Sequence, residues 1–308
     1  MIPLPSDDSE AQPRQAGHIH RRDFLMNGIK VTASLFVLDW MRVPAFAARA
    51  GKLATGPMPP KVDDSIGMLA DYMTRYTVPQ GNFPATGGWK ATYDLIGWIG
   101  EPGPHVPPHN PPVGQLVITR KGDASGGKIG YDIDYVIHMN GWDTGLKSTM
   151  ECSADRLPRL LKWQTHYENH SVNDPGRSWA LTEQGECKEG VMEIVSKAGT
   201  RRFQTALPVA PQWAVIDALR GAKADPADPI AGARYDMLHN LTSYRPGQTI
   251  KPCGVLDMTI GGQPYQFHGF IQTGHGNEPT HFWVDSAGRP LLTTGGLRAS
   301  ALTSIQAA

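Results

Sequence analysis

Apolar and polar residues alternate with a period of two along most of the chain after residue 88. In the clearest stretch, every second residue is apolar: Tyr131, Ile133, Tyr135, Ile137 and Met139. Polar residues occupy the positions between them. Because successive side chains of a strand point to opposite faces, this pattern predicts a strand with one face on a hydrophobic core.

Similar segments recur with hairpin spacing. They cover residues 89–96, 114–119, 146–154, 161–170, 178–186, 191–206, 254–260, 265–272, 281–285 and 290–294. Helical spacing of apolar residues occurs in short stretches at 64–76, 211–219 and 234–241. Glycine and proline contribute 34 and 26 of the 308 residues, which favours many turns and short strands. We therefore expect a mainly β fold, an antiparallel sandwich or half-open curved barrel with two or three short helices.

Near the N-terminus, the paired arginines Arg21 and Arg22 precede the uncharged run 31–38, and Ala-x-Ala sequences follow. This order resembles a bacterial twin-arginine export signal, cleaved after Ala47 or Ala50. The resemblance implies passage through the twin-arginine translocon in a folded state and a periplasmic location. The run is much shorter than the ~20 residues of a membrane-spanning helix, so no stable membrane anchor is expected. A buried amphipathic helix with two surface arginines is the alternative.

This signal divides the chain into a leader at 1–50, a helical and loop lead at 51–88, and a β-rich domain at 89–308. The chain contains 29 lysine and arginine residues and 29 aspartate and glutamate residues, so its formal net charge is zero. Nucleic-acid binding requires a basic stripe, and the sequence has none, so we expect no nucleic-acid partner.

The three cysteines, Cys152, Cys187 and Cys253, follow the predicted cleavage sites. In the oxidising periplasm, two of them could form one disulfide and leave one thiol over. Three isolated, buried thiols are an equally good interpretation. The sequence does not choose among the pairings, and the spacings are too wide for a zinc knuckle.

Histidines are densest near the predicted strand at 265–272. His268 lies in that strand, His275 in the following loop and His281 in the next strand. If the faces of the two strands match, His268 and His281 lie close together and could perform acid–base chemistry near neutral pH. Three histidines could also bind a metal ion, but their spacing fits no metal motif, so we assign no metal ligand. The alternative is a set of polar residues on a wet strand face.

A second histidine group lies in the predicted strand at 161–170, where His166, Glu168 and His170 would share one face. The carboxylate between the two imidazoles could hold a proton or a cation. Tyrosine and histidine on a concave β-sheet move protons in many polysaccharide lyases, which is an analogy of fold alone. A solvated strand face is the alternative. His166 is therefore a catalytic candidate beside His268 and His281.

The sequence contains no nucleophile elbow, phosphate loop, dinucleotide fingerprint or haem-attachment motif, and we predict no cofactor. Aromatic residues are frequent in the predicted strands, notably Trp89, Tyr93, Trp163 and Trp283. On a concave face, these rings would bind a glycan or an amphipathic or aromatic small molecule. The first hypothesis is thus an exported ligand-binding protein. The second is a cofactor-free lyase or hydrolase that uses histidine acid–base chemistry on a carbohydrate-like substrate.

The C-terminal segment at 254–297 has a recognisable arrangement of motifs. A strand pair follows Arg245-Pro246-Gly247-Gln248, and Phe282-Trp283-Val284-Asp285 leads into Gly288-Arg289-Pro290-Leu291. These features resemble a group of exported proteobacterial proteins of unknown function. The resemblance implies a curved antiparallel sheet, which the strands at 89–206 also fit, and it carries over no catalytic residue.

Overall fold

The computed structural model describes residues 66, 69–84, 86–97, 110–122, 127–295 and 298–308. They belong to one compact unit, Pro60–Ala308. The predicted leader, including Arg21, Arg22 and both cleavage sites, lies outside the described residues. No helix among the residues described is long and apolar enough to cross a membrane.

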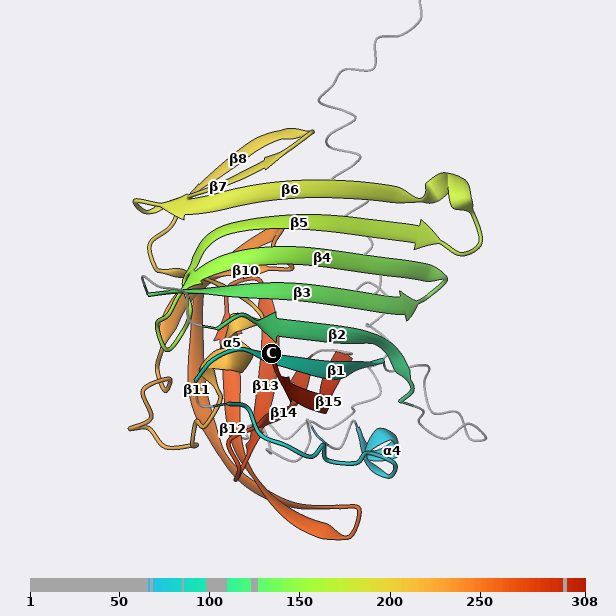
Figure 1. Ribbon diagram of the computed structural model, residues 1–308, viewed down its shortest axis with the longest axis vertical. Coiled ribbons are helices and arrows are strands. Elements are labelled where there is room, and N and C mark those ends of the chain that lie inside the picture. The colour runs from blue at the N-terminus through green and yellow to red at the C-terminus, as the bar shows by residue number, and fades with distance from the viewer. Residues whose placement is uncertain (1–65, 67–68, 85, 98–109, 123–126, 296–297) are drawn as a thin grey trace, which may run out of the picture. The chain divides into compact units, whose positions relative to one another are not determined.

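Among the described residues, fifteen strands form one curved, unclosed sheet in the order β8-β7-β6-β5-β4-β3-β2-β1-β15-β14-β13-β12-β11-β10-β9 (Figure 1). Their bounds are β1 (Trp89–Gly97), β2 (Pro112–Arg120), β3 (Lys128–Met139), β4 (Trp142–Ser153), β5 (Leu160–Ser171), β6 (Trp179–Lys188), β7 (Val191–Ser196), β8 (Gly199–Gln204), β9 (Val209–Pro211), β10 (Arg234–His239), β11 (Ser243–Ile260), β12 (Gln263–Gly274), β13 (Asn277–Asp285), β14 (Pro290–Gly295) and β15 (Arg298–Ala307). The helices are α4 (Ala70–Met73), α5 (Ala214–Ala218) and the 3-10 turn η1 (Pro175–Arg177). The expected mainly β fold with short helices is confirmed.

Tight turns connect most neighbouring strands. Asn140 and Gly141 between β3 and β4 have φ values of 55° and 76°, and Gly261 and Gly262 between β11 and β12 have 57° and 80°. Two successive left-handed residues form the hairpin turn whose twist matches that of the strands. Local sequence therefore fixes the antiparallel order of these neighbours.

The first and last strands pair with each other. Their register runs from Trp89 opposite Ala307 to Gly97 opposite Arg298. This pairing joins β2–β8 and β9–β14 into one sheet with β1 and β15 at its centre. Only β9 and β10 pair in parallel among the described strands.

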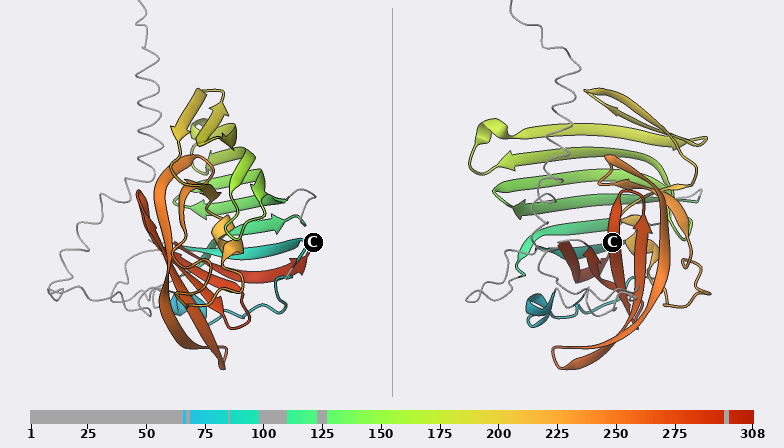
Figure 2. Two further views of the ribbon diagram at one scale, coloured as in Figure 1. Left: turned by 90° about the vertical axis from the view of Figure 1, so that its left-hand side faces the viewer. Right: turned by 180° about the vertical axis from the view of Figure 1, so that it is seen from behind.

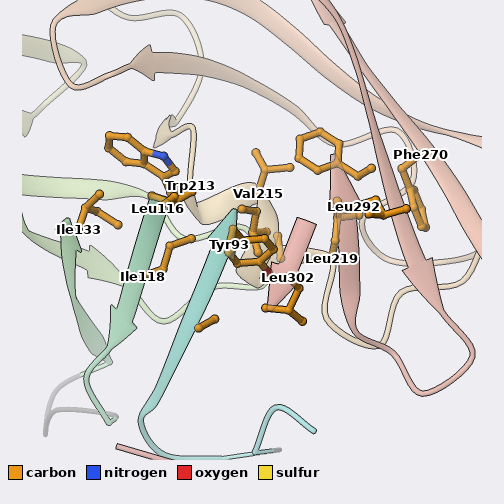
Figure 3. Packing of buried hydrophobic residues seen from close by; sticks show 14 of the residues in the cluster. Tyr93, Leu116, Ile118, Ile133, Trp213, Val215, Leu219, Phe270, Leu292 and Leu302 are labelled. Carbon is orange, nitrogen blue, oxygen red and sulfur yellow. The ribbon is translucent and has the colours of Figure 1, made fainter. Parts of the chain in front are cut away.

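The two halves of the sheet fold around α5. In Figures 1 and 2, β3–β6 run crosswise to β11–β13, and α5 lies between them. Figure 3 shows Val215 and Leu219 between Tyr93 on one side and Phe270 on the other. All five residues of α5 are buried. We call the sheet face that packs around α5, and that carries Tyr93, the inner face.

Two sequence predictions fail in the C-terminal half. The segment at 234–241, expected to be a helix, contains strand β10, and β15 was not expected at all. Tyr235, Asp236, Met237 and Leu238 are all buried, so β10 is covered on both faces and shows no alternation. A continuous buried run cannot be distinguished from a helix by its periodicity.

Strand β15 escaped prediction for a different reason. Its sequence is dominated by alanine, serine and threonine, so it carries little of the large apolar pattern that identifies a strand. Pairing with β1 and β14 on its two sides determines its conformation instead.

A buried ion cluster holds α5 against the first half of the sheet. Asp217 accepts a hydrogen bond from Arg120 Nε of β2 at 3.2 Å, and further ones from Tyr131 Oη of β3 and Arg220 Nε. The Asp217 side chain is 6 % exposed and that of Arg120 is 10 %. Burial, followed by the Asp217 charge, raises the pKa of Tyr131, which therefore remains a neutral donor. Two guanidinium groups thus compensate one carboxylate in the protein interior.

The segment before β1 is attached to the sheet by the same kind of contact. Arg289 binds Asp285 Oδ2 through Nη2 at 2.7 Å and donates from Nη1 to the carbonyls of Pro79 and Gly81 at 2.6 and 3.0 Å. Tyr76 Oη donates to the carbonyl of Leu302 at 2.8 Å. These contacts attach residues 76–81 to β15 and to the turn between β13 and β14.

The three cysteines are free thiols. Burial raises the pKa of all three, to about 12 for Cys187 and about 11 for Cys253. The thiolate is the nucleophilic form, so these groups are unreactive at neutral pH in the folded chain.

Replacing Asp217 by alanine should lower the free energy of unfolding by about 3–5 kcal/mol, because Arg120 and Arg220 would remain buried without their carboxylate. Urea unfolding monitored by tryptophan fluorescence measures this loss. The matched control is Asp257→Ala, at an exposed position of β11, which should change stability by less than about 0.5 kcal/mol. Equal midpoints for the two variants would contradict the structural role of Asp217.

Candidate functional site

The predicted histidine pair does not converge. Strand register places His268 opposite Val284, whereas His281 lies opposite Ile271. Side chains on paired residues share a face, and neighbouring positions alternate. His268 and His281 therefore point to opposite faces of the sheet, and the premise that the two strand faces match is wrong.

Each of these histidines has a separate environment. His281 is half-buried, its ring stacks on that of Trp283 with centroids 6.2 Å apart, and burial lowers its pKa. His268 is also half-buried, and its Nδ1 has no hydrogen-bond partner among the described residues. The catalytic role of either residue stays a prediction, without the shared pocket on which it depended.

His166 lies on the exposed face of β5, away from both. The expected grouping is present: His166 Nε2 lies 3.0 Å from Glu168 Oε1, and His170 Nε2 lies 3.1 Å from Glu168 Oε2. The hydrogen bonds to His170 and His166 lower the pKa of Glu168. Within the described part of the chain, no three histidine, cysteine, aspartate or glutamate side chains are placed to hold a metal ion.

The four predicted ligand-binding aromatics are core residues. Trp89, Tyr93 and Trp283 are 0 % exposed and Trp163 is 4 % exposed. The ring of Phe83, for example, packs edge-on against that of Trp89, with ring centroids 4.9 Å apart. These rings pack in the core, and their role in ligand binding stays a prediction.

An aromatic wall of partly exposed rings does occur on the inner face. It consists of Tyr135 on β3, Tyr167 on β5 and Trp179 on β6. Tyr135 and Tyr167 flank the same residue of β4, Leu146. The rings of Tyr167 and Trp179 stack with centroids 5.6 Å apart and planes 4° from parallel.

Basic side chains come from the other half of the sheet. His239 ends β10, Arg245 lies near the start of β11 and Arg298 begins β15. Arg298 hydrogen-bonds the Tyr135 side chain, and its charge acts on Tyr167 and His239. Arg298 therefore lies close to three residues that come from three different strands.

Strand register explains this meeting. In an antiparallel meander, the end of one strand and the start of the next lie at the same edge of the sheet. The β3–β4 and β5–β6 connections lie at one edge of the sheet, and the aromatic wall lies toward this edge. Arg298 begins β15 opposite Gly97 at the same edge. Together with His239 and Arg245, we call these six residues the Arg298 cluster.

Burial and neighbouring charges shift the pKa values of several residues of the Arg298 cluster. Burial, together with the charges of Arg245 and Arg298, lowers the pKa of His239 to about 3, so its imidazole is neutral at pH 7. Burial raises the pKa of Tyr167 to about 12 and that of Tyr135 as well, so both hydroxyls stay protonated. The cluster thus combines neutral donors with two permanently charged guanidinium groups.

Arg245 has polar neighbours of its own. Its Nη1 donates to Asn277 Oδ1 at 2.5 Å, and Glu278 is the negative charge that acts on it. Burial lowers the pKa of Arg245, although the guanidinium remains charged. The described environment of Arg245 therefore includes one amide oxygen and one carboxylate charge.

A separate open groove of about 780 Å³ crosses β3–β7, and its lining includes exposed side chains on the face opposite α5. Lys128, Glu151, Lys162 and Glu186 are among its lining residues, and Trp163 contributes as well. Lys128 Nζ and Glu151 Oε1 pair with each other at 2.7 Å. Opposite charges that pair with each other in open solvent contribute little binding energy to a ligand, so the groove is the weaker candidate site.

Sequence reasoning missed most of the Arg298 cluster. The sequence pattern identifies Tyr135 as an inward-facing residue of its strand and Arg245 only as part of a motif, and it does not single out Trp179, His239 or Arg298. His239 lay in a segment expected to be helical, and Arg298 in one expected to have no strand. Partial exposure on an inward face is the signal that identifies such residues, and it requires the tertiary structure.

No protein-family model matches the chain, and no curated protein sequence matches it. The similarity to exported proteobacterial proteins stays a prediction drawn from the motifs at 245–291. The geometry and charge of the Arg298 cluster are therefore what supports a functional proposal.

The low pKa of His239 predicts a specific dependence of stability on pH. In the unfolded chain, the imidazole has its ordinary pKa of about 6.5. As the pH falls from 6.5 toward 3, the unfolded state therefore binds a proton at His239 that the folded state does not bind. The stability that neutral His239 contributes is fully present above pH 6.5 and is lost as the pH falls from 6.5 to about 3. Between pH 7 and 4.5, His239→Gln should lose about 1–2 kcal/mol less stability than the wild type in urea unfolding. Parallel losses in the two proteins would show that His239 is not held neutral.

Proposed function

We propose that the chain is an exported periplasmic protein that binds an amphipathic small ligand at the Arg298 cluster. The observation that carries the proposal is the aromatic wall, in which the stacked Tyr167–Trp179 pair continues to Tyr135, whose side chain bonds Arg298. The rings keep partial solvent contact, so an apolar or aromatic group of a ligand can displace water from them.

The physical chemistry of this wall suits a ligand with two kinds of surface. Aromatic pairs contribute about 0.5–1.5 kcal/mol beyond the area they bury. Small-molecule sites combine mostly apolar walls with a few convergent polar groups that fix orientation. Tyr167 and Trp179 supply the apolar part, and Arg298 with the Tyr135 hydroxyl supplies the polar part.

Export through the twin-arginine pathway fits the topology of the sheet. Because β1 pairs with β15, the central strands meet after the whole chain has been synthesised. A chain of this kind folds before it crosses a membrane or is kept unfolded until it has crossed. The Arg21-Arg22 signal supports the first route, and no metal or organic cofactor is needed to explain it.

Ligand binding is tested with 1-naphthaleneacetate, an aromatic ring with a short charged arm, by titration calorimetry on the processed protein. We expect saturable binding to one site per chain. Trp179→Ala should weaken it by about tenfold, equivalent to about 1.4 kcal/mol, because the probe loses its stacking partner. The matched control is Tyr265→Ala on the β11–β12 hairpin, which removes a partly exposed ring outside the cluster. Equal affinities for the two variants would contradict the proposed site.

Export is tested by replacing Arg21 and Arg22 together with lysine. Lysine keeps the charge but lacks the planar guanidinium, so the precursor should remain in the cytoplasmic fraction at its full length. Replacement of Arg14 by lysine, in the polar leader, is the control and should leave periplasmic accumulation unchanged. Normal accumulation of the double variant would contradict twin-arginine export.

A further inference from the structure

We propose that the open groove of about 780 Å³ across β3–β7 binds a neutral, linear glycan chain that lies crosswise to the strands. Exposed side chains on the face opposite α5 line this groove, so the site is separate from the Arg298 cluster on the inner face. It adds a second ligand class to the small-molecule binding proposed for that cluster.

Strand register shows how the groove is built. Most of its lining residues fall into two rows that run across the strands, a charged row and an amide row. The charged row consists of Gly130, Glu151, Lys162, Glu186 and Glu193, and the amide row consists of Thr149, Gln164, Gln184 and Val195. From β3 to β7 the groove is about 19 Å long, since neighbouring strands are ~4.8 Å apart. A trough of this length suits a chain-like ligand.

The floor of the groove is the main chain of the sheet. Met150 and Trp163 lie between the two rows, but their side chains are buried in the core, at 5 % and 4 % exposure. Their main chain therefore forms the floor, because side chains of a strand alternate between its faces. Packing beneath the floor keeps the groove in place whether or not a ligand is bound.

This floor disfavours an extended peptide as the ligand. Strands β4, β5 and β6 are each paired on both sides, so their N–H and C=O groups already bond to neighbouring strands. A peptide adds to a sheet through main-chain bonds at a free edge. In the groove, a ligand has to bond to side chains instead.

The amide row offers hydrogen bonds that match hydroxyl groups. Gln164 lies between Thr149 and Gln184 in the register of β4, β5 and β6, and all three side chains are exposed. An amide presents an acceptor oxygen and two N–H donors, and a hydroxyl group both donates and accepts. A sugar hydroxyl can therefore bond to any member of this series. Partners repeated one strand apart suit a ligand with regularly repeated hydroxyls.

The charges of the groove are balanced. Three lysines and three glutamates are among its described lining residues: Lys121, Lys128, Lys162, Glu151, Glu186 and Glu193. Lys128 Nζ lies 2.7 Å from Glu151 Oε1, and Arg202 Nε lies 2.5 Å from Glu193 Oε2. A ligand of either sign would meet like charges in the same wall, and like-charge contacts are unfavourable. A neutral ligand that bonds through hydroxyls avoids this repulsion.

The lining also disfavours an apolar ligand. Sites for apolar small molecules are lined mostly by hydrophobic and aromatic side chains. Trp163 is the one aromatic residue among the described residues of the lining, and its ring is buried. Binding energy therefore has to come from several hydrogen bonds along the groove, which a chain of linked sugars can form together. We expect weak but saturable binding that strengthens with chain length.

The decisive experiment titrates oligosaccharides into the nitrogen-15-labelled wild-type protein at pH 6, followed by NMR. The neutral probes are maltohexaose and chitohexaose, and the charged probe is the deacetylated, cationic form of chitohexaose. We expect at least one neutral hexamer to saturate and to shift the side-chain amide resonances of Gln164 and Gln184. Chitohexaose should bind about threefold or more tightly than its cationic form.

Variants assign the binding to the amide row. Gln164→Ala and Gln184→Ala should each weaken binding of the neutral hexamer about threefold to tenfold, because each removes exposed hydrogen-bonding groups. The matched control is Gln115→Ala, at an exposed glutamine of β2 outside the described lining, which should leave the affinity unchanged. Lys162→Glu makes the lining negative and should strengthen binding of the cationic hexamer about threefold or more.

Each remaining outcome contradicts a defined part of the proposal. Failure of both neutral hexamers to bind, or equal affinities of Gln164→Ala and Gln115→Ala, would overturn the groove as a glycan site. Tighter binding of the cationic hexamer to the wild type would overturn the choice of a neutral ligand. Tighter binding of an uncharged, capped serine–threonine hexapeptide would overturn the choice of a glycan.

A competition measurement separates this inference from the function proposed for the Arg298 cluster. Saturating 1-naphthaleneacetate should leave the affinity for the neutral hexamer unchanged, because the two sites lie on opposite faces of the sheet. Displacement of the hexamer by 1-naphthaleneacetate would place the glycan on the inner face and contradict the groove. Loss of glycan binding alone would leave the proposed small-molecule site intact.

Discussion

Pairing of β1 with β15 is the constraint on which the remaining structure depends. The hairpin turns specify neighbours along the chain, but they would leave two separate meanders. The register from Trp89–Ala307 to Gly97–Arg298 joins these meanders at the centre of one sheet. It also positions Arg298, because the residue that begins β15 has to lie opposite the end of β1. The candidate site therefore depends on the contact of longest sequence separation in the sheet.

Folding of the sheet around α5 creates an inner face with two different parts. At one part, Asp217 neutralises Arg120 and Arg220 in a buried cluster that holds α5 on β2 and β3. At the other, Arg298 meets the Tyr135 hydroxyl, and the surrounding rings are partly exposed. The first arrangement is typical of a satisfied structural ion cluster. The second is polar, aromatic and accessible, which is what a ligand site requires.

The aromatic residues show why burial, rather than residue type, separates structure from function here. Trp89, Tyr93, Trp163 and Trp283 were the most conspicuous rings in the sequence, and the fold uses all four as core. Large rings contribute much of the apolar area that a sheet can bury, so they are common at strand positions that face the core. Trp179 lies near the start of β6, at a sheet edge where packing is incomplete, and its ring remains available.

The sequence by itself determined the class of fold, most strand positions and the hairpin turns, because these follow from alternation over neighbouring residues and from glycine at left-handed positions. It also determined that His166, Glu168 and His170 share a face, since a strand's period of two requires it. The tertiary structure decided that His268 and His281 diverge, because their facing depends on register between strands. It alone brought Arg298 to Tyr135, Tyr167 and His239. No local pattern determines which strand ends meet when the described strands fold around one short helix.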